Sequence, residues 1–238
     1  MTISVLYAIL FYAAALLFVV GVGRKIVIYA RTPAPLKIPT TPAPLTKRGV
    51  AWRITKEVTV FQSLFKSNKW IWLFGWTFHV ALALVLFRHL RYFQEPVWTV
   101  IALIQPFGKY AGFAMLAGLL GLWARRFLVD RVRYVTSLSD HLMLALLVGI
   151  GFSGLAITYL SRTDIVAVKS YMMGLLYFDL QPLPSDAFVL IHLALVITLL
   201  VVFPISKLLH VPGLFFMPTR NQVDNPREVR HTAGWTAK

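Results

Sequence analysis

The sequence predicts an all-α fold, an integral membrane bundle of five transmembrane helices with the N-terminus outside and the C-terminus in the cytoplasm. Of its 238 residues, 58% are hydrophobic and 14% are charged, and the mean hydropathy is +0.70. This composition is too apolar for an ordinary soluble domain. The apolar residues also gather into separate blocks of about 20 residues, the length that a helix needs to cross hydrocarbon. Residues 1–238 are therefore expected to form a single membrane domain.

In chain order, the predicted spans are about 3–22, 71–90, 110–128, 141–160 and 188–209. The first block has no basic segment before it and no small-residue cleavage site after it, so a retained span fits better than a signal peptide. Two further apolar segments, 97–104 and 170–180, are too short to cross the membrane. We expect them to be interfacial or re-entrant.

The basic residues predict the topology. The loop 24–69, the segment 125–140 and the tail from Lys207 together carry 19 Lys and Arg, whereas the segments on the other side carry 5. By the positive-inside rule, the basic loop 24–69 and the tail 211–238 are cytoplasmic. In a chain this apolar, the formal charge of +15 is a topology signal, so we expect the lipid bilayer and no nucleic acid as a partner.

The first loop also contains two Pro-rich stretches, which begin at Thr32 and Thr40. They have an extended bias and are either a docking surface for a soluble partner or a solvated linker. The chain contains no cysteine, which excludes disulfides, cysteine-ligated iron–sulfur clusters and covalent c-type haem. A redox metal in this chain therefore needs other ligands.

Four of the six histidines fall within or at the ends of the second and fifth predicted helices, where an ionisable side chain is costly and usually functional. His79 and His89 are ten residues, roughly 15 Å, apart, and His192 and His210 are eighteen residues, roughly 27 Å, apart. Because the two helices run in opposite directions, we expect His89 to match His192 near the outer face and His79 to match His210 near the cytoplasm. Helix tilt and a kink at Pro204 accommodate the difference between these two distances along the helices.

Two imidazoles on facing helices saturate a haem iron, so these pairs predict two b-type haems that carry electrons. The alternative is that they are core histidines hydrogen-bonded between helices. A zinc site is disfavoured, since the two pairs are too far apart along the axis to share one ion.

Other polar residues near the predicted haems allow two readings each. Arg88 and Arg91 flank the outer histidine and either pair with haem propionates or extend to the interface; Lys207 has the same options at the inner haem. Lys109 either hydrogen-bonds a quinone carbonyl or anchors the helix at the interface. His141 has no partner at matching depth and is left out of the site.

These residues form a pattern that resembles a known family. Phe78-His79, nine further residues and His89, then Ile191-His192-Leu193, and finally the run from Phe203 to His210 resemble the gamma, or cytochrome b, subunit of respiratory nitrate reductases. The resemblance implies two haems b, with His79 and His210 on the cytoplasmic side and His89 and His192 on the outer side. It also implies a multi-pass protein of a bacterial or archaeal cytoplasmic membrane.

Within that superfamily, residues 61–76 and 88–93 look closer to DsrM, the membrane cytochrome of the Dsr sulfur-metabolism complex. This likeness implies an electron-transfer subunit with quinol/quinone oxidoreductase activity, exchanging electrons between menaquinone, or another quinone, and a cytoplasmic iron–sulfur subunit that is DsrK-like. Other membrane and periplasmic subunits of the complex are implied as well. The sequence departs from the nitrate reductase pattern in its longer first loop. It also has Tyr110 or Lys109 only approximately where that pattern has quinone-site lysines.

The sequence thus predicts a membrane di-haem cytochrome b subunit of a respiratory complex in dissimilatory sulfur metabolism. The alternatives are the gamma subunit of a respiratory nitrate reductase and a haem-poor membrane anchor. A transporter or channel is disfavoured, because all nine acidic residues fall at helix ends or in loops.

Overall fold

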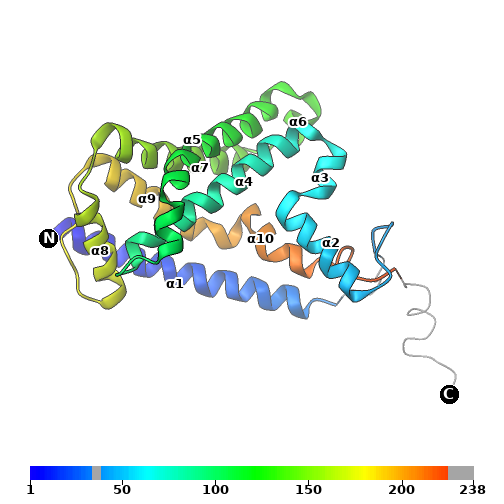
Figure 1. Cartoon of the computed structure of the whole chain (residues 1–238), viewed down its shortest axis with the longest axis horizontal. Coiled ribbons are helices and arrows are strands. Elements are labelled where there is room, and N and C mark those ends of the chain that lie inside the picture. The colour runs from blue at the N-terminus through cyan, green and yellow to red at the C-terminus, as the bar shows by residue number, and fades with distance from the viewer. Residues whose placement is uncertain (34–38, 225–238) are drawn as a thin grey trace, which may run out of the picture. The chain divides into compact units, whose positions relative to one another are not determined.

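The computed structural model describes residues 1–33 and 39–224, and this part of the chain is helical without strands. Five helices are long and apolar enough to cross a membrane (Figure 1): Thr2–Arg31, Lys69–Phe93, Thr99–Leu128, Leu138–Ser161 and Ala187–Ile205. The all-α class and the prediction of five membrane-spanning helices are confirmed, and the chain is a multi-pass membrane protein. Residues 34–38 of the Pro-rich loop and 225–238 of the predicted tail lie outside the described residues.

The chain divides into two compact units. The first unit comprises Met1–Leu16 and Asn68–Val201, and the second comprises Leu17–Ser67 and Val202–Lys238. The long helix α1 (Thr2–Arg31) contributes to both.

In the first unit, α4 (Lys69–His89) lies beside α5 (Thr99–Leu128) along most of its length (Figure 1). Glycine permits this close packing. A Cβ atom on Gly118 would lie 2.8 Å from the carbonyl oxygen of Phe74, and one on Gly108 would lie 2.8 Å from Cβ of Arg88. The buried core between these helices consists of Phe78, Ala81, Ala111, Met115 and Leu119.

The remaining helices of this unit are α6 (Asp130–Val135), α7 (Leu138–Ala156), α8 (Ile165–Tyr177) and α9 (Ala187–Val202). The chain continues from α4 into the short η1 (Leu90–Phe93) and from α7 into a π-helical turn, η2 (Ile157–Ser161). Helix α7 packs on α5. Helix α8 includes most of the segment 170–180, which the sequence predicts to be too short to span the membrane. The 13 residues of the helix are indeed too few to cross hydrocarbon.

The start of α5 differs from the prediction. The sequence predicts a separate interfacial or re-entrant piece at residues 97–104, yet from Thr99 onward they are the first turns of α5, and Ile101 is only 3% exposed. Proline disfavours helical geometry in the residue before it and removes one hydrogen bond, which is why Pro106 indicates a break. Packing of α5 against α4 keeps the helix continuous through Pro106.

A second core holds the first half of α1 against α8 and α9. Tyr171 is fully buried, and its hydroxyl donates to the carbonyl oxygen of Ser4 at 3.1 Å. Burial raises the pKa of Tyr171 to about 12, so the hydroxyl stays a donor at any physiological pH. Tyr7 donates to the carbonyl oxygen of Leu190 at 2.9 Å in the same way.

The second unit contains α2 (Lys47–Val60) and α3 (Gln62–Ser67), the second half of α1, and the chain after Val202. Glu57 on α2 accepts from the backbone amide of Ser63 at 3.1 Å and pairs with Arg220 at 3.0 Å. Thr40 also donates its backbone amide to the carbonyl oxygen of Thr219 at 2.8 Å. The first loop and the start of the tail therefore form one hydrogen-bonded structure.

The fifth span also differs from the prediction of a helix through residue 209. Helix α9 ends at Val202 and is followed by η3 (Phe203–Ile205), extended Ser206 (φ −102, ψ 172), η4 (Lys207–Leu209), α10 (His210–Gly213) and η5 (Leu214–Phe216). Pro204 cannot continue the helical hydrogen bonding, and the Ser206 hydroxyl caps the next turn by accepting from the amide of Leu208 at 3.2 Å. The continuous helix on which the predicted distance between His192 and His210 was based is therefore interrupted at Ser206.

Candidate functional site

The structure brings together His89, at the end of α4, and His192, in the second turn of α9. Their ring centroids are 6.3 Å apart and their ring planes differ by 20°. This separation is too long for direct stacking contact between two imidazoles. The two rings are therefore close neighbours that do not touch by stacking.

Both rings are fixed by hydrogen bonds at Nδ1. His89 Nδ1 lies 2.6 Å from the carbonyl oxygen of Val85, and His192 Nδ1 lies 3.1 Å from that of Ile150. Because a carbonyl oxygen only accepts, Nδ1 carries the proton in each ring, and the lone pair of the neutral imidazole is on Nε2. Metal-binding histidines characteristically donate their second ring N–H to such an acceptor.

Helix α7 supports His192 with its small-residue face. Ser153 is buried, and its hydroxyl oxygen lies 3.0 Å from Nδ1 of His192. The same hydroxyl donates to the carbonyl oxygen of Gly149 at 2.7 Å, so it accepts from the imidazole. A Cβ atom on Gly154 would lie 3.2 Å from Cε1 of His192, so a side chain at this position would press on the ring.

His79 and His210 show the same ring orientation in their local surroundings. His79 Nδ1 lies 2.7 Å from the carbonyl oxygen of Gly75, and His210 Nδ1 lies 2.9 Å from that of Lys207. His79 belongs to the first unit and His210 to the second. Their pairing stays a prediction.

His141 differs from these four histidines. The indole nitrogen of Trp123 donates to Nδ1 of His141 at 3.0 Å, so this Nδ1 is the acceptor and the proton of the neutral ring is on Nε2. This is the opposite tautomer to that of the four histidines above. The sequence-based exclusion of His141 from the site agrees with this arrangement.

Arg88 and Arg91, predicted near the outer haem, share one acceptor that the sequence analysis missed. Oε1 of Gln105 on α5 accepts from Nε of Arg88 at 3.3 Å and from a terminal nitrogen of Arg91 at 3.1 Å. Within the described residues, no ion pair joins either guanidinium to a carboxylate. The available signal for Gln105 was an amide directly after the apolar segment 97–104 and directly before Pro106.

The two predicted lysines lie elsewhere. Lys109 is exposed on α5, and its Nζ lies 5.7 Å from the ring centroid of Tyr159 in η2. Lys207 begins η4 in the second unit, where its backbone carbonyl accepts from His210.

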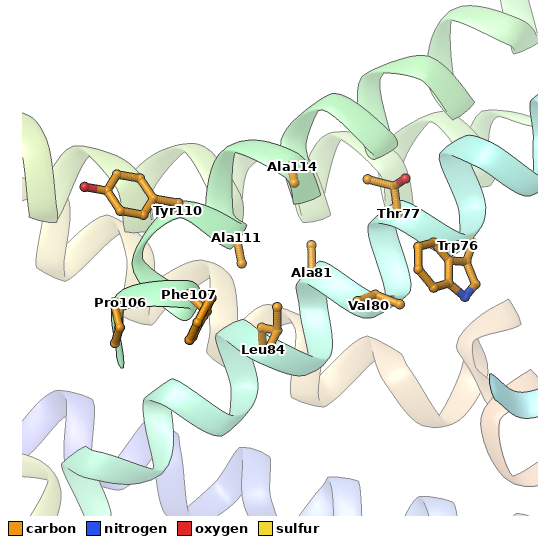
Figure 2. A pocket seen from close by; sticks show the side chains of 10 residues that line it. All are labelled: Trp76, Thr77, Val80, Ala81, Leu84, Pro106, Phe107, Tyr110, Ala111 and Ala114. Carbon is orange, nitrogen blue, oxygen red and sulfur yellow. The ribbon is translucent and has the colours of Figure 1, made fainter. Parts of the chain in front are cut away.

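An apolar groove of about 510 Å³ opens between α4 and α5 (Figure 2). Trp76, Thr77 and Leu84 line it from α4, and Phe107 and Tyr110 line it from α5. Its volume falls in the range of about 300–1,000 Å³ that is typical of small-molecule sites. Its lining is almost entirely hydrocarbon and aromatic.

Asp186 fixes the start of α9. Its carboxylate accepts from the hydroxyl of Ser161 and from the backbone amide of Val189, the latter at 3.1 Å. Hydrogen bonds hold the pKa of Asp186 below its ordinary value. The largest contribution comes from the Ser161 hydroxyl, and the backbone amides of Val189 and Phe188 add to it. The ionised carboxylate thereby caps the helix that carries His192.

Comparison with known proteins shows which proteins this chain resembles. A family model described as "Nitrate reductase gamma subunit" matches residues 48–231. A protein of Archaeoglobus fulgidus, named "Hdr-like menaquinol oxidoreductase cytochrome b-like subunit", is 35% identical, with 94% of this chain and 81% of that protein covered. A protein of Archaeoglobus profundus with the same name is 29% identical, with 94% and 80% covered.

Proposed function

The chain belongs to the nitrate reductase gamma subunit family, and from this we propose that it is the di-haem cytochrome b subunit of a menaquinol oxidoreductase complex. It is a multi-pass protein of an archaeal or bacterial membrane, as the family and the five apolar helices indicate. In this proposal it carries electrons between a quinone in the membrane and a cytoplasmic iron–sulfur subunit.

The observation that supports the proposal most is the separation of His89 and His192. Two imidazoles that bind one iron from opposite sides, each through a nitrogen about 2 Å away, place their ring centroids roughly 6 to 6.5 Å apart. The observed distance is 6.3 Å. A haem iron with both axial positions filled in this way carries single electrons and has no open position for oxygen chemistry.

The histidines contribute orientation as well as ligation. Each Nδ1–H donates to a backbone carbonyl, which leaves the lone pair of Nε2 in His89 and in His192 available for the iron. Hydrogen bonding at Nδ1 also raises the basicity of the ligating nitrogen. We assign the outer haem to this pair.

We assign the inner haem to His79 and His210, with Lys207 as a contact for one of its propionates. Both histidines donate Nδ1–H to a carbonyl oxygen, as the outer pair does. This shared tautomer supports the assignment. We also assign Arg88 and Arg91 to the propionates of the outer haem, because two guanidinium groups match two carboxylates in charge and geometry.

For the quinone we propose the outer half of the membrane. Both Archaeoglobus relatives are named menaquinol oxidoreductase subunits, so we take menaquinol as the substrate. The apolar groove between α4 and α5 suits its isoprenoid chain, and Lys109 follows the groove residue Phe107 by two positions. Lys109 then donates to a quinone carbonyl if its ammonium leaves the Tyr159 ring.

For the partner we propose a DsrK-like cytoplasmic iron–sulfur subunit in dissimilatory sulfur metabolism, alongside other membrane and periplasmic subunits. It would dock on the basic first loop, of which α2 carries Lys47, Arg48, Arg53 and Lys56. A nitrate reductase gamma subunit is the second candidate, and the relatives' name favours the first.

The haem content of the purified chain tests the proposal. We expect two haems b per chain in the wild type and one after His89→Ala or His192→Ala. His141→Ala is the matched control, since its ring has the opposite tautomer, and it should retain both. A dithionite-reduced spectrum without haem b absorption in the wild type would overturn the proposal.

A further inference from the structure

The side-chain amide of Gln105 has a buried nitrogen, Nε2, for which the proposed haem site gives no function so far. Its Oε1 already accepts from Arg88 and from Arg91. Because two donors converge on this oxygen, the amide cannot be turned around without placing its own N–H groups against them. Its Nε2 is buried and has no hydrogen-bond partner among the described residues.

A buried donor without an acceptor is costly, and so is a half-buried guanidinium without a counter-charge. Arg88 and Arg91 are both half-buried, and no carboxylate of the described residues pairs with either. The acidic residue nearest to them in sequence, Glu95, pairs with Lys169 instead. Within the described residues the two positive charges thus have no carboxylate partner, and an anionic ligand would supply the counter-charge.

The guanidinium groups of Arg88 and Arg91 and the amide N–H of Gln105 all suit an anionic ligand. Guanidinium groups bind carboxylate and phosphate oxygens, and an amide N–H donates to the same oxygens. The cluster also adjoins the proposed outer haem: Arg88 precedes His89, and the guanidinium of Arg91 lies 5.9 Å from the ring centroid of Tyr92. The ring of Tyr92 in turn lies 5.8 Å from that of His89.

We propose that Gln105 is a positioning residue that fixes Arg88 and Arg91 and donates its Nε2–H to the haem propionate that they bind. The proposal rests on the outer haem of the proposed function. Two features that Gln105 alone combines support it: an oxygen shared by both arginines and a buried nitrogen that still needs an acceptor. An anionic lipid headgroup offers the same oxygen chemistry, so the test distinguishes the two sources.

The test is a redox titration of the outer haem at several pH values, from about pH 5 to pH 9. The full chain carries His79→Ala, which in the proposed function leaves the outer haem alone. In that background we compare unchanged Gln105 with Gln105→Leu and Gln105→Glu. The matched control is Gln181→Leu, an amide whose nitrogen donates to the carboxylate of Asp179 at 2.9 Å.

Gln105→Leu should make the ionised form of the propionate less stable. The substitution removes one hydrogen-bond donor and also the oxygen that holds both arginines in place. The pKa of the propionate then rises, and the pH-dependent part of the midpoint potential moves to higher pH. Haem dissociation should become roughly tenfold faster, as expected for the loss of one hydrogen bond to a charged group. Gln105→Glu should lower the midpoint potential near neutral pH, since its carboxylate adds negative charge beside Arg88 and Arg91, and negative charge favours the ferric state.

The proposal is wrong if the pH profiles of Gln105→Leu and unchanged Gln105 superimpose, or if Gln181→Leu shifts the profile equally. It is also wrong if removing phospholipid from the protein with unchanged Gln105 reproduces the profile of Gln105→Leu, since the anion is then a lipid phosphate. Absence of haem from the wild type is a separate outcome. That result overturns the proposed function itself.

Discussion

Cε1 of His192 lies 3.2 Å from the position that a Cβ atom would take on Gly154. The imidazole of α9 thus rests on the backbone of α7, while Ser153 and Ile150 on the same helix hold its Nδ1. The position of the ring depends on the absence of a side chain at residue 154. Helix α7 therefore supports the imidazole of His192 in its position.

Gly154→Val should displace His192 and lower the haem content from two per chain towards one. A contact of 3.2 Å leaves no room for a branched side chain, and metal ligation tolerates little displacement. The measurement is the haem-to-protein ratio of the purified variant. Gly149→Ala is the matched control, because its Cβ would meet the flexible Leu195 at 3.3 Å; equal haem loss in both variants would contradict this role of Gly154.

Ser153→Ala should keep both haems and raise the midpoint potential of the outer one. The serine hydroxyl accepts from His192 Nδ1, and losing this acceptor makes the ligating nitrogen less basic, which disfavours the ferric state. The carbonyl oxygen of Ile150 remains as an acceptor at 3.1 Å, so the haem should be retained. Redox titration measures the shift, and an unchanged or lowered potential would argue against it.

Asp186→Asn should destabilise the protein at neutral pH and have little effect at strongly acidic pH. The Ser161 hydroxyl and backbone amides lower the pKa of Asp186 from its ordinary value of 3.8, so the folded state favours the ionised carboxylate. This stabilisation is fully present above the unfolded pKa and is lost as the pH falls through the lower folded pKa. Thermal unfolding of the wild type and the variant at neutral and acidic pH measures the difference.

Ser161→Ala serves as the companion to this variant, because it removes the largest cause of the pKa shift without touching the carboxylate. It should reproduce part of the destabilisation at neutral pH. A stability difference between Asp186→Asn and the wild type that does not change with pH would show that the carboxylate is not the source.

Tyr171→Phe should lower the free energy of unfolding by about 1–3 kcal/mol, because it leaves the buried carbonyl oxygen of Ser4 without this donor. Tyr12→Phe is the matched control. Its hydroxyl donates to the carbonyl oxygen of Leu175 at 2.8 Å, but this bond is exposed, so its loss leaves no carbonyl oxygen unpaired in the protein core. Denaturation in detergent measures both, and an equal cost for the two variants would contradict the role of burial.

The membrane spans could be predicted from the sequence because hydrocarbon selects for runs of apolar residues, whatever their neighbours in the fold. Their ends could not be predicted equally well. Pro106 indicates a break, yet α5 continues through it against α4, whereas Pro204 does end α9. Packing against other helices decides between these outcomes, and packing is not visible in a local sequence window.

The candidate site, too, could be predicted only in part from the sequence. Histidines are rare and costly inside membrane helices, so the sequence alone singled out His89 and His192. Only the tertiary structure brings their rings to 6.3 Å and places the proton of each on Nδ1. It also joins Gln105 to two arginines 17 and 14 residues away. Solvent preference acts on each residue separately and is therefore encoded locally, whereas the distance between two side chains depends on how whole helices pack.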